Sequence, residues 1–270
     1  SILEGLEENG LGIVNRDFES LDEALSLYSS VKLITFGKSV EADWRLSNIK
    51  FFNTNMVCSL TSNIYDFDFG INALGEHHAI NATATLCAVH AIGADLSGAI
   101  VGLKNWKPFK GRGERSLIKW KLDRYQSDLE LIDESYNASP ASVEASLHTL
   151  AISKPPAIHG RRVAILGDML ELGQTEKSLH EEIVKYPSLN DINIVHCVGE
   201  LMNSLFQNLP PGKRGLLTLT AGDFLANLTG VLKPGDVVMV KGSLSMKMNL
   251  IVDAIKELGQ VVELIDEESI

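Results

Sequence analysis

The sequence predicts an α/β protein whose C-terminal half forms an open, mostly parallel sheet. Short apolar runs bounded by Gly, Pro, Asn or Asp recur through that half, and helix-like stretches separate them. The chain has 270 residues, of which 45% are hydrophobic and 22% charged, so it is long enough to bury the cores of about two domains. No internal repeat or low-complexity tract interrupts this pattern.

The N-terminal part begins with the apolar runs LGIVN (11–15) and VKLITF (31–36), with a Leu-rich segment between them. This order predicts two strands joined by a crossover helix. Residues 48–70 alternate less regularly and predict antiparallel strands. The alanine-rich segment 77–94 predicts a helix.

The middle of the chain contains two further β-like runs, 116–122 and 128–132, followed by a predicted helix that starts at Pro140. Ser139 is a suitable N-cap, and proline fits the first helical turn. Apolar residues recur on one face of that helix. They are Val143, Leu147, Leu150 and Ala151.

The segment SKPPAIHGRR (153–162) predicts a domain boundary, because two prolines and a glycine interrupt the pattern there. We expect one domain over 1–157 and another over 158–270. The second domain has five predicted strands with helix-like stretches between them, which indicates helices on both faces of its sheet. These strands are RRVAILGD, NIVHCVG, LLTLT, DVVMVKGS and VVELI.

Charge and cysteine usage exclude several classes of protein. The formal net charge is -11 and no long Lys/Arg cluster occurs, which argues against binding to nucleic acid or to an anionic membrane. Cys58, Cys87 and Cys197 lack metal-ligand spacing and have apolar neighbours, so we expect buried free thiols in a reducing compartment. Without a run of about 18 apolar residues or a signal-peptide pattern, a cytoplasmic location is expected.

The stretch LIDESYNASP (131–140) joins a strand, two acids and a helix start. In open α/β sheets, ligands bind outside the carboxyl ends of strands, and a helix N-terminus offers free amides. An acid at this strand end can accept ribose hydroxyls, while Tyr136 and Asn137 can contact the ligand. The alternative is that Asp133 and Glu134 belong to a solvated turn before a capped helix.

The stretch GEHHAINATA (75–84) places His77, His78 and Asn81 on a predicted helix. Adjacent histidines suggest zinc, but helical zinc pairs are spaced i, i+4, and no H-E-x-x-H pattern occurs. The three side chains can contact a ligand from one helix face, or they can simply cap and pack the helix.

The glycine-punctuated loop KPFKGRGERS (107–116) carries Arg112 and Arg115 before a strand. A loop arginine can bind phosphate bidentately and stabilise charge during phosphoryl transfer, or it can belong to an ordinary basic loop. Another glycine-containing turn, GKS at 37–39, imitates the end of a P-loop. We reject it, because Lys32 stands where G-x-x-x-x-G-K-[ST] requires glycine.

LGDMLELG (166–173) and VKGSLSMKM (240–248) each place glycine and polar residues directly after a predicted buried strand. Asp168, Lys241 and Ser243 can therefore converge on one edge of the sheet and bind a ligand. The alternative is that these are tight turns and helix caps. Because no G-x-G-x-x-G occurs, a dinucleotide-dependent oxidoreductase is disfavoured.

Taken in order, these motifs resemble the Mur ligases, the ATP-dependent amino acid ligases of bacterial peptidoglycan synthesis. The resemblance covers nearly the whole chain, and it is greatest to the branch that joins D-alanyl-D-alanine to UDP-MurNAc-tripeptide. The motifs that carry it are GEHHAINA, FKGR, IDESYNASP, RRVAILGDMLELGQTEKSLHEEI and VKGSLSMKM.

The resemblance implies an incomplete central ATPase domain followed by a Rossmann-like C-terminal domain. It implies a reaction in which ATP and Mg²⁺ convert the peptide carboxylate into an acyl phosphate, which the amine of D-alanyl-D-alanine attacks. UDP-MurNAc-tripeptide and D-alanyl-D-alanine are then the partners, with neither nucleic acid nor membrane insertion. Phosphoryl transfer of this kind depends on positioning and charge neutralisation.

The resemblance also implies roles for individual residues. Asn81 matches an adenine-contacting asparagine, Arg112 a catalytic phosphate-facing arginine, and Glu134 an acid beside the ribose, with Tyr136 and Asn137 at the nucleotide rim. Residues expected near the incoming substrate are Asp168, His180, Lys241 and Ser243. Two positions depart from the family pattern: His78 replaces the first adenine-contacting asparagine, and Leu244 replaces an arginine.

The resemblance further implies that a UDP-sugar domain, a P-loop and the main metal ligands precede Ser1, so that no metal ligand is expected within the chain. We therefore expect a C-terminal fragment that by itself neither hydrolyses ATP nor forms the amide bond. The alternative is a non-catalytic nucleotide-binding or assembly remnant, which the departures at His78 and Leu244 favour.

Overall fold

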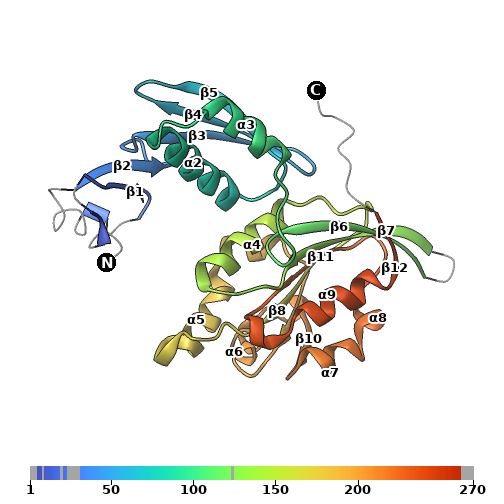
Figure 1. Ribbon diagram of the computed structural model, residues 1–270. Helices are drawn as coiled ribbons and strands as arrows, with labels where there is room; N and C mark the ends of the chain where they lie inside the picture. Colours follow the sequence, from blue (N-terminus) through green and yellow to red (C-terminus); the bar gives the residue numbers. More distant parts are fainter. Residues whose placement is uncertain (1–4, 8, 19–20, 23–30, 123–124, 263–270) are drawn as a thin grey trace. The chain divides into compact units, whose positions relative to one another are not determined.

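The computed structural model describes residues 5–7, 9–18, 21–22, 31–122 and 125–262. The chain forms two compact units, Ser1–Lys107 and Pro108–Ile270 (Figure 1). The boundary predicted at 157/158 therefore falls inside the second unit. No helix in the described ranges is long and apolar enough to cross a membrane.

The first unit contains a five-stranded sheet in the order β1-β2-β3-β4-β5. The strands β1 to β3 are parallel, whereas β3, β4 and β5 are antiparallel. This confirms the predicted strands at 11–15 and 31–36 and the antiparallel pairing within 48–70. The predicted crossover helix lies largely outside the described residues. The strands are β1 (Leu11–Asn15), β2 (Lys32–Gly37), β3 (Trp44–Phe51), β4 (Met56–Ser62) and β5 (Asp66–Ile71).

Two helices, α2 (Glu76–Ala91) and α3 (Leu96–Asn105), cover one face of this sheet (Figure 1). The predicted helix over 77–94 corresponds to α2, which buries small and apolar residues against the strands. The second helix, α3, was not predicted. Its start signal is Asp95, whose carboxylate accepts a hydrogen bond from the Ser97 amide as an N-cap.

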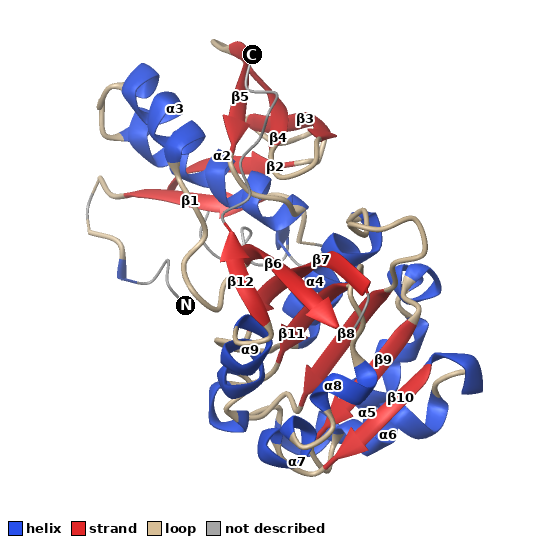
Figure 2. Ribbon diagram, turned by 90° about the vertical axis from the view of Figure 1, so that its right-hand side faces the viewer, coloured by secondary structure: helices blue, strands red, loops and turns tan. Residues whose placement is uncertain are grey.

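The second unit contains a seven-stranded sheet in the order β10-β9-β8-β11-β7-β6-β12 (Figure 2). Neighbouring strands from β10 to β7 are parallel, and β6 and β12 add antiparallel pairs at one edge. This confirms the predicted α/β class and mostly parallel sheet. The strands are β6 (Glu114–Leu122), β7 (Tyr125–Glu134), β8 (Arg162–Gly167), β9 (Ile194–Val198), β10 (Arg214–Thr218), β11 (Val237–Lys241) and β12 (Gly259–Val262).

Helices cover both faces of this sheet, as the alternating pattern predicted. One face carries α4 (Pro140–Ile152), α5 (Glu176–Glu182) and α6 (Met202–Asn208), and the other carries α7 (Ala221–Leu225), α8 (Leu228–Val231) and α9 (Asn249–Lys256). Short 3₁₀ turns complete the connections. They are η2 (Gly173–Thr175), η3 (Ile183–Lys185), η4 (Pro187–Asp191), η5 (Pro211–Lys213) and η6 (Leu244–Met246).

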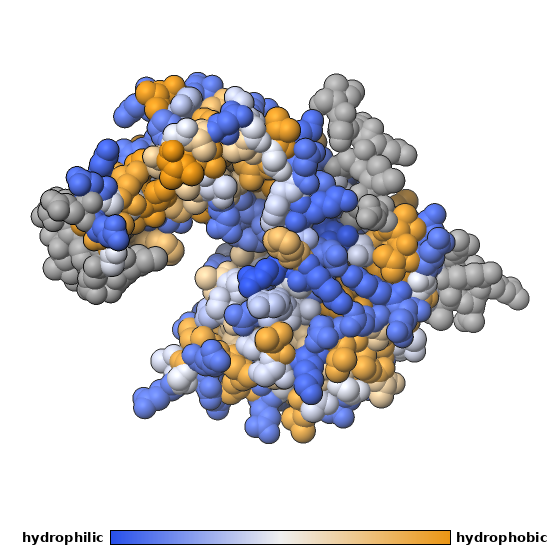
Figure 3. Space-filling model, in the orientation of Figure 1, coloured by the Kyte–Doolittle hydropathy of each residue, from blue (hydrophilic) through white to orange (hydrophobic). Residues whose placement is uncertain are grey.

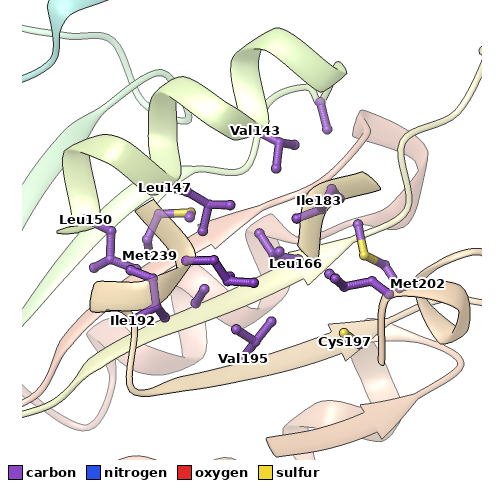
Figure 4. Packing of buried hydrophobic residues seen from close by; sticks show 14 of the residues in the cluster. Val143, Leu147, Leu150, Leu166, Ile183, Ile192, Val195, Cys197, Met202 and Met239 are labelled. Atoms are coloured by element: carbon purple, nitrogen blue, oxygen red, sulfur yellow. The ribbon is translucent and has the colours of Figure 1, made fainter. Parts of the chain in front are cut away.

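The central strand β11 shows why its sequence is continuously apolar. Val237 and Met239 pack in the cluster under α4, whereas Val238 and Val240 pack in the cluster under α9. Both faces of a covered parallel strand are buried, so side chains of both orientations are apolar. Figure 4 shows the first cluster, in which Leu147 of α4 points toward the strands. Each such fully buried side chain stabilises the fold by about 1.5–3 kcal/mol.

The three cysteines are free and buried, as predicted. Burial raises the pKa of the Cys58, Cys87 and Cys197 thiols to about 12. They therefore behave as small hydrophobic residues and not as nucleophiles. On the face shown in Figure 3, hydrophobic residues at the surface of each unit are interspersed with hydrophilic ones.

Candidate functional site

Four segments of the second unit meet at the edge of the sheet where β7, β8 and β11 end. In the strand register, Lys241 of β11 lies between Glu134 of β7 and Leu166 of β8. The antiparallel strand β6 starts at the same edge, because Glu114 pairs with Asp133. We call this edge the carboxyl rim and define it as segments 108–113, 133–139, 167–172 and 241–248.

Asp133 links two of these segments. Its side chain is buried, with 1% exposed. One carboxylate oxygen accepts the Gly111 amide at 3.0 Å, and the other accepts the amide and hydroxyl of Ser135 at 3.1 and 2.6 Å. The acid at this position therefore organises the rim from inside, and the alternative of a solvated turn does not describe it.

Arg112 and Tyr136 form an exposed stack on the rim. The Arg112 guanidinium carbon lies 4.2 Å from the centroid of the Tyr136 ring, and 45% of Tyr136 is exposed. The neighbouring Asn137 uses its side-chain oxygen to accept the amide of Ala138 at 2.9 Å. The stack holds the Arg112 guanidinium against the Tyr136 ring, and this exposed side chain can donate two hydrogen bonds to a phosphate.

Glu134 and Lys241 form a buried ion pair beneath the rim. The Lys241 Nζ lies 3.4 Å from Glu134 Oε2 and donates to the Asn137 carbonyl at 3.0 Å. Burial raises the pKa of Glu134 and lowers the pKa of Lys241, and in both cases the attraction of the partner charge opposes the effect of burial. The carboxylate expected beside a ribose is thus engaged with Lys241.

Asp168 follows β8 and supports the neighbouring turn. Its carboxylate accepts the amides of Leu201 at 3.3 Å and Met202 at 2.8 Å, where α6 begins. Its backbone carbonyl accepts the Ser243 amide at 3.0 Å. Burial raises the pKa of Asp168, and the Met202 and Leu201 amides act in the opposite direction.

His180 and Ser243 both hold the segment after β8. The Met169 amide donates to His180 Nε2 at 2.9 Å, so this nitrogen carries no proton, and Nδ1–H donates to the Glu176 carbonyl at 2.6 Å. The Ser243 hydroxyl oxygen accepts the Leu170 amide at 2.9 Å. With no exposed surface, the His180 ring shapes the rim through the backbone that it binds.

His78 and Asn81 belong to the first unit, on α2. The His78 ring lies 4.0 Å from the His77 ring and 5.3 Å from the Trp106 ring, measured between centroids. Burial lowers the pKa of His78 to about 3, so the ring is neutral near pH 7. Its Nε2 is buried and has no hydrogen-bond partner within the described part of the chain, whereas Asn81 is exposed.

Two other features identified in the sequence, Arg115 and the GKS turn, bond to carboxylates of the chain itself. Arg115 lies inside the second unit, where its Nε donates to Glu130 at 2.7 Å, so it is not a free loop arginine. In the first unit, the amides of Lys38 and Ser39 in the GKS turn donate to the Asp17 carboxylate at 2.8 to 2.9 Å. This turn thus binds an anion of its own chain.

Sequence reasoning singled out Asp133 beside Glu134 as support for the turn, but it did not assign Gly111 to the site. The signal for Asp133 was present, because an aspartate two residues before an amide that it can accept is typical of an Asx turn. Its second partner, Gly111, is 22 residues away in sequence. No local pattern indicates such a contact.

Two Mur ligase family models match the chain. The model described as "Mur ligase middle domain" matches residues 1–89, and the one described as "Mur ligase, glutamate ligase domain" matches residues 122–244. Solved structures agree on the fold. MurF from Acinetobacter baumannii has a TM-score of 0.77 at 22% identity over 95% of this chain and 53% of that one. MurF from Thermotoga maritima in complex with ADP has a TM-score of 0.72 at 21% identity over 93% and 54%.

Sequence relatives carry the name UDP-N-acetylmuramoyl-tripeptide–D-alanyl-D-alanine ligase. The relative from Rickettsia prowazekii is 26% identical over 93% of this chain and 54% of its own length. The relative from Escherichia coli is 28% identical over 96% and 54%. This chain thus spans about half the length of the curated relatives it matches. Because it carries the middle and glutamate-ligase domain sequences in that order, the chain belongs to the Mur ligase family.

Proposed function

We propose that this chain provides part of an ATP-dependent ligase that joins D-alanyl-D-alanine to UDP-MurNAc-tripeptide through an acyl phosphate. The observation that carries the proposal is that relatives named for this activity match 93% to 96% of the chain, across both of its units. Arg112, exposed on the rim and oriented by Tyr136, has the chemistry needed for the phosphate-facing catalytic role.

The remaining nucleotide roles rest on chemistry visible in each unit. In the first unit, the buried and unpaired Nε2 of His78 is a hydrogen-bonding atom that an adenine can satisfy, with Asn81 one helical turn away. In the second unit, Tyr136 stacks with Arg112, and Asn137 follows Tyr136 in the sequence, so we assign both to nucleotide binding. Glu134 acts there through Lys241, which fixes the Asn137 carbonyl.

On the side of the incoming substrate, Lys241 and Ser243 are buried within the rim, and Ser243, Asp168 and His180 hold its loops in place. ATP supplies the phosphoryl group that activates the carboxylate. A magnesium ion is proposed with it. However, no three His, Cys, Asp or Glu side chains among the described residues gather to hold a metal, so we assign no step to it within them.

Ligand titrations of the ¹⁵N-labelled chain test this proposal. We expect D-alanyl-D-alanine to shift amide signals of segments 167–172 and 241–248, and a non-hydrolysable ATP analogue to shift those of 109–113 and 135–137. Arg112→Ala should weaken binding of the ATP analogue at least tenfold, because a hydrogen bond to a charged group contributes about 1.5–3 kcal/mol. Lys185→Ala, an exposed cation outside the rim, is the matched control.

The outcomes separate the two candidate functions. Binding of the nucleotide analogue without any response to the dipeptide supports the non-catalytic nucleotide-binding remnant, which Leu244 favours as an exposed apolar residue where the family has an arginine. A response to neither ligand contradicts both functions. An in-frame G-x-x-G-K-T coding sequence upstream of Ser1 would support the ligase.

The isolated 270-residue chain is expected to be inactive as an ATPase and as a ligase. Its sequence contains no complete G-x-x-x-x-G-K-[ST] pattern to position a bound triphosphate for reaction. Phosphate release should therefore stay at background when the chain is mixed with ATP, magnesium, UDP-MurNAc-tripeptide and D-alanyl-D-alanine. ATP-dependent phosphate release by the purified chain, with or without the dipeptide, would contradict this expectation.

A further inference from the structure

We propose that Asp133 is the positioning residue for Arg112: its buried carboxylate fixes segment 109–113 against segment 135–137 and so creates the Arg112–Tyr136 stack. The importance of this role for catalysis rests on the function proposed above. The positioning itself is a property of the chain without any ligand.

The contacts around Asp133 join the two segments at three points. Its Oδ2 accepts the Gly111 amide at 3.0 Å, and its backbone carbonyl accepts the Gly113 amide at 2.8 Å. These two bonds bracket Arg112 in the sequence. On the other side, its Oδ1 accepts the amide and hydroxyl of Ser135, the residue before Tyr136. One side chain therefore sets the backbone next to both members of the stack.

Gly111 provides the close approach that this arrangement requires. Its φ of +78° lies in the left-handed region, and its carbonyl accepts the Tyr136 amide at 3.1 Å. A Cβ at this position would lie 2.9 Å from the Tyr136 Cβ. The two segments are thus in direct contact at the point where the Asp133 carboxylate binds them.

Segment 109–113 also has an ion pair with α9, but this pair does not explain how the segment is held against segment 135–137. Lys110 Nζ lies 3.1 Å from Asp253 of α9, but the two side chains are 63% and 47% exposed. An ion pair in that setting contributes little, because solvent screens it. Asp133 is buried and binds backbone amides, so its bonds persist while surface side chains move.

The chemistry of the carboxylate makes Asp133→Asn an informative variant. Three donors face the two oxygens: the Gly111 amide on one, and the amide and hydroxyl of Ser135 on the other. An asparagine has one oxygen, so its NH₂ group must face either the Gly111 amide or the Ser135 amide, and two donors cannot bond. In either orientation the side chain stops joining the two segments, and only the backbone bonds of Gly113 to Asp133 and of Tyr136 to Gly111 still connect them.

The test is the side-chain Nε–Hε signal of Arg112 in NMR spectra of the ¹⁵N-labelled chain, assigned by its absence in Arg112→Lys. In the original chain, the Tyr136 ring should shift this signal upfield, and Tyr136→Leu should remove the shift. We expect Asp133→Asn and Asp133→Ala to remove it as well. Asp128→Asn, on the same strand and away from the rim, should retain it and serves as the matched control.

Amide signals of β9 and β10, which do not pair with the strand that carries Asp133, report whether each variant is folded. Loss of the Arg112 shift in folded Asp133→Asn supports the proposal. An unchanged Arg112 shift in folded Asp133→Asn, or in folded Asp133→Ala, overturns it. Because the spectra are recorded without nucleotide or dipeptide, this result is independent of whether the chain binds either one.

Discussion

At the scale of single residues, Asp133 and Glu134 show how adjacent acids divide their roles. Successive side chains of a strand point to opposite faces, so the two carboxylates at the end of β7 have different surroundings. Asp133 binds the backbone of two loops, whereas Glu134 pairs with Lys241. Neither acid is an exposed general acid or base, and each bonds to another segment of the rim.

Lys241→Met should destabilise the second unit by about 3 kcal/mol, because it leaves the buried Glu134 carboxylate without its partner charge. Urea unfolding followed by circular dichroism measures the loss. Adding Glu134→Gln should recover most of it, since no buried charge then remains.

The matched control for this prediction is Lys185→Met. It removes an exposed ion pair with Glu182 at 3.9 Å and should change the free energy of unfolding by less than about 0.5 kcal/mol. A Lys241→Met variant as stable as this control would show that the buried pair does not stabilise the unit.

At the scale of elements, the start of α4 fixes the end of the 133–139 segment. Ser139 accepts the Ser142 amide, and the Ser142 hydroxyl accepts the Ser139 amide at 2.8 Å, which is a reciprocal capping box. Pro140 occupies the first turn, where its missing amide hydrogen costs nothing. The cap starts α4 at Pro140, shortly after Tyr136 and Asn137. The N-terminus of the helix therefore lies next to the rim.

Ser139→Ala should lower the free energy of unfolding of the second unit by about 1 kcal/mol, because the first-turn amide of Ser142 loses its acceptor. Ser139→Asp should preserve most of the stability, since its carboxylate can accept the same amide and favours a helix N-terminus. Thermal unfolding compares the three proteins. Equal losses for both variants would mean that the cap is not the source of the effect.

At the scale of the whole molecule, each unit contains a histidine that is neutral near pH 7. Burial lowers the pKa of His78 in the first unit to about 3 and that of His196 in the second unit to about 4. The His196 Nδ1 accepts the Leu216 amide at 2.8 Å, which also requires an unprotonated nitrogen. Acid therefore favours the unfolded state of both units.

The sign of this effect gives a pH window. Below pH 6.5 the unfolded chain binds a proton at His196 and the folded chain does not, so stability falls until the pH reaches about 4. The loss from His196 should be on the order of 3 kcal/mol across that window, at 1.36 kcal/mol per pKa unit. Urea unfolding at pH 7, 6, 5 and 4 measures it.

His196→Asn tests the assignment, because the asparagine oxygen can replace Nδ1 as the acceptor and does not titrate. This variant should lose the part of the pH dependence that His196 contributes. His159→Asn, at an exposed position, is the control and should behave like the original chain. Identical pH profiles for His196→Asn and the original chain would contradict the prediction.

The sequence by itself determined what depends on local pattern. Apolar runs specified the strands, the Ser139–Pro140 pair specified the start of α4, and the order of motifs indicated the Mur ligase family. These features follow from side-chain periodicity and from backbone preferences of single residues, which act over a few positions.

Only the tertiary structure decided which distant segments meet. The strands β6 and β7 pair with β12 and β11, so they belong to the unit that starts at Pro108, although the Pro/Gly-rich segment after α4 had suggested a later boundary. The same holds for the rim: Asp133 binds Gly111 across 22 positions, and Glu134 meets Lys241 across 107. Such contacts depend on strand order and register, which arise from packing of the whole sheet and leave no periodic trace in the sequence.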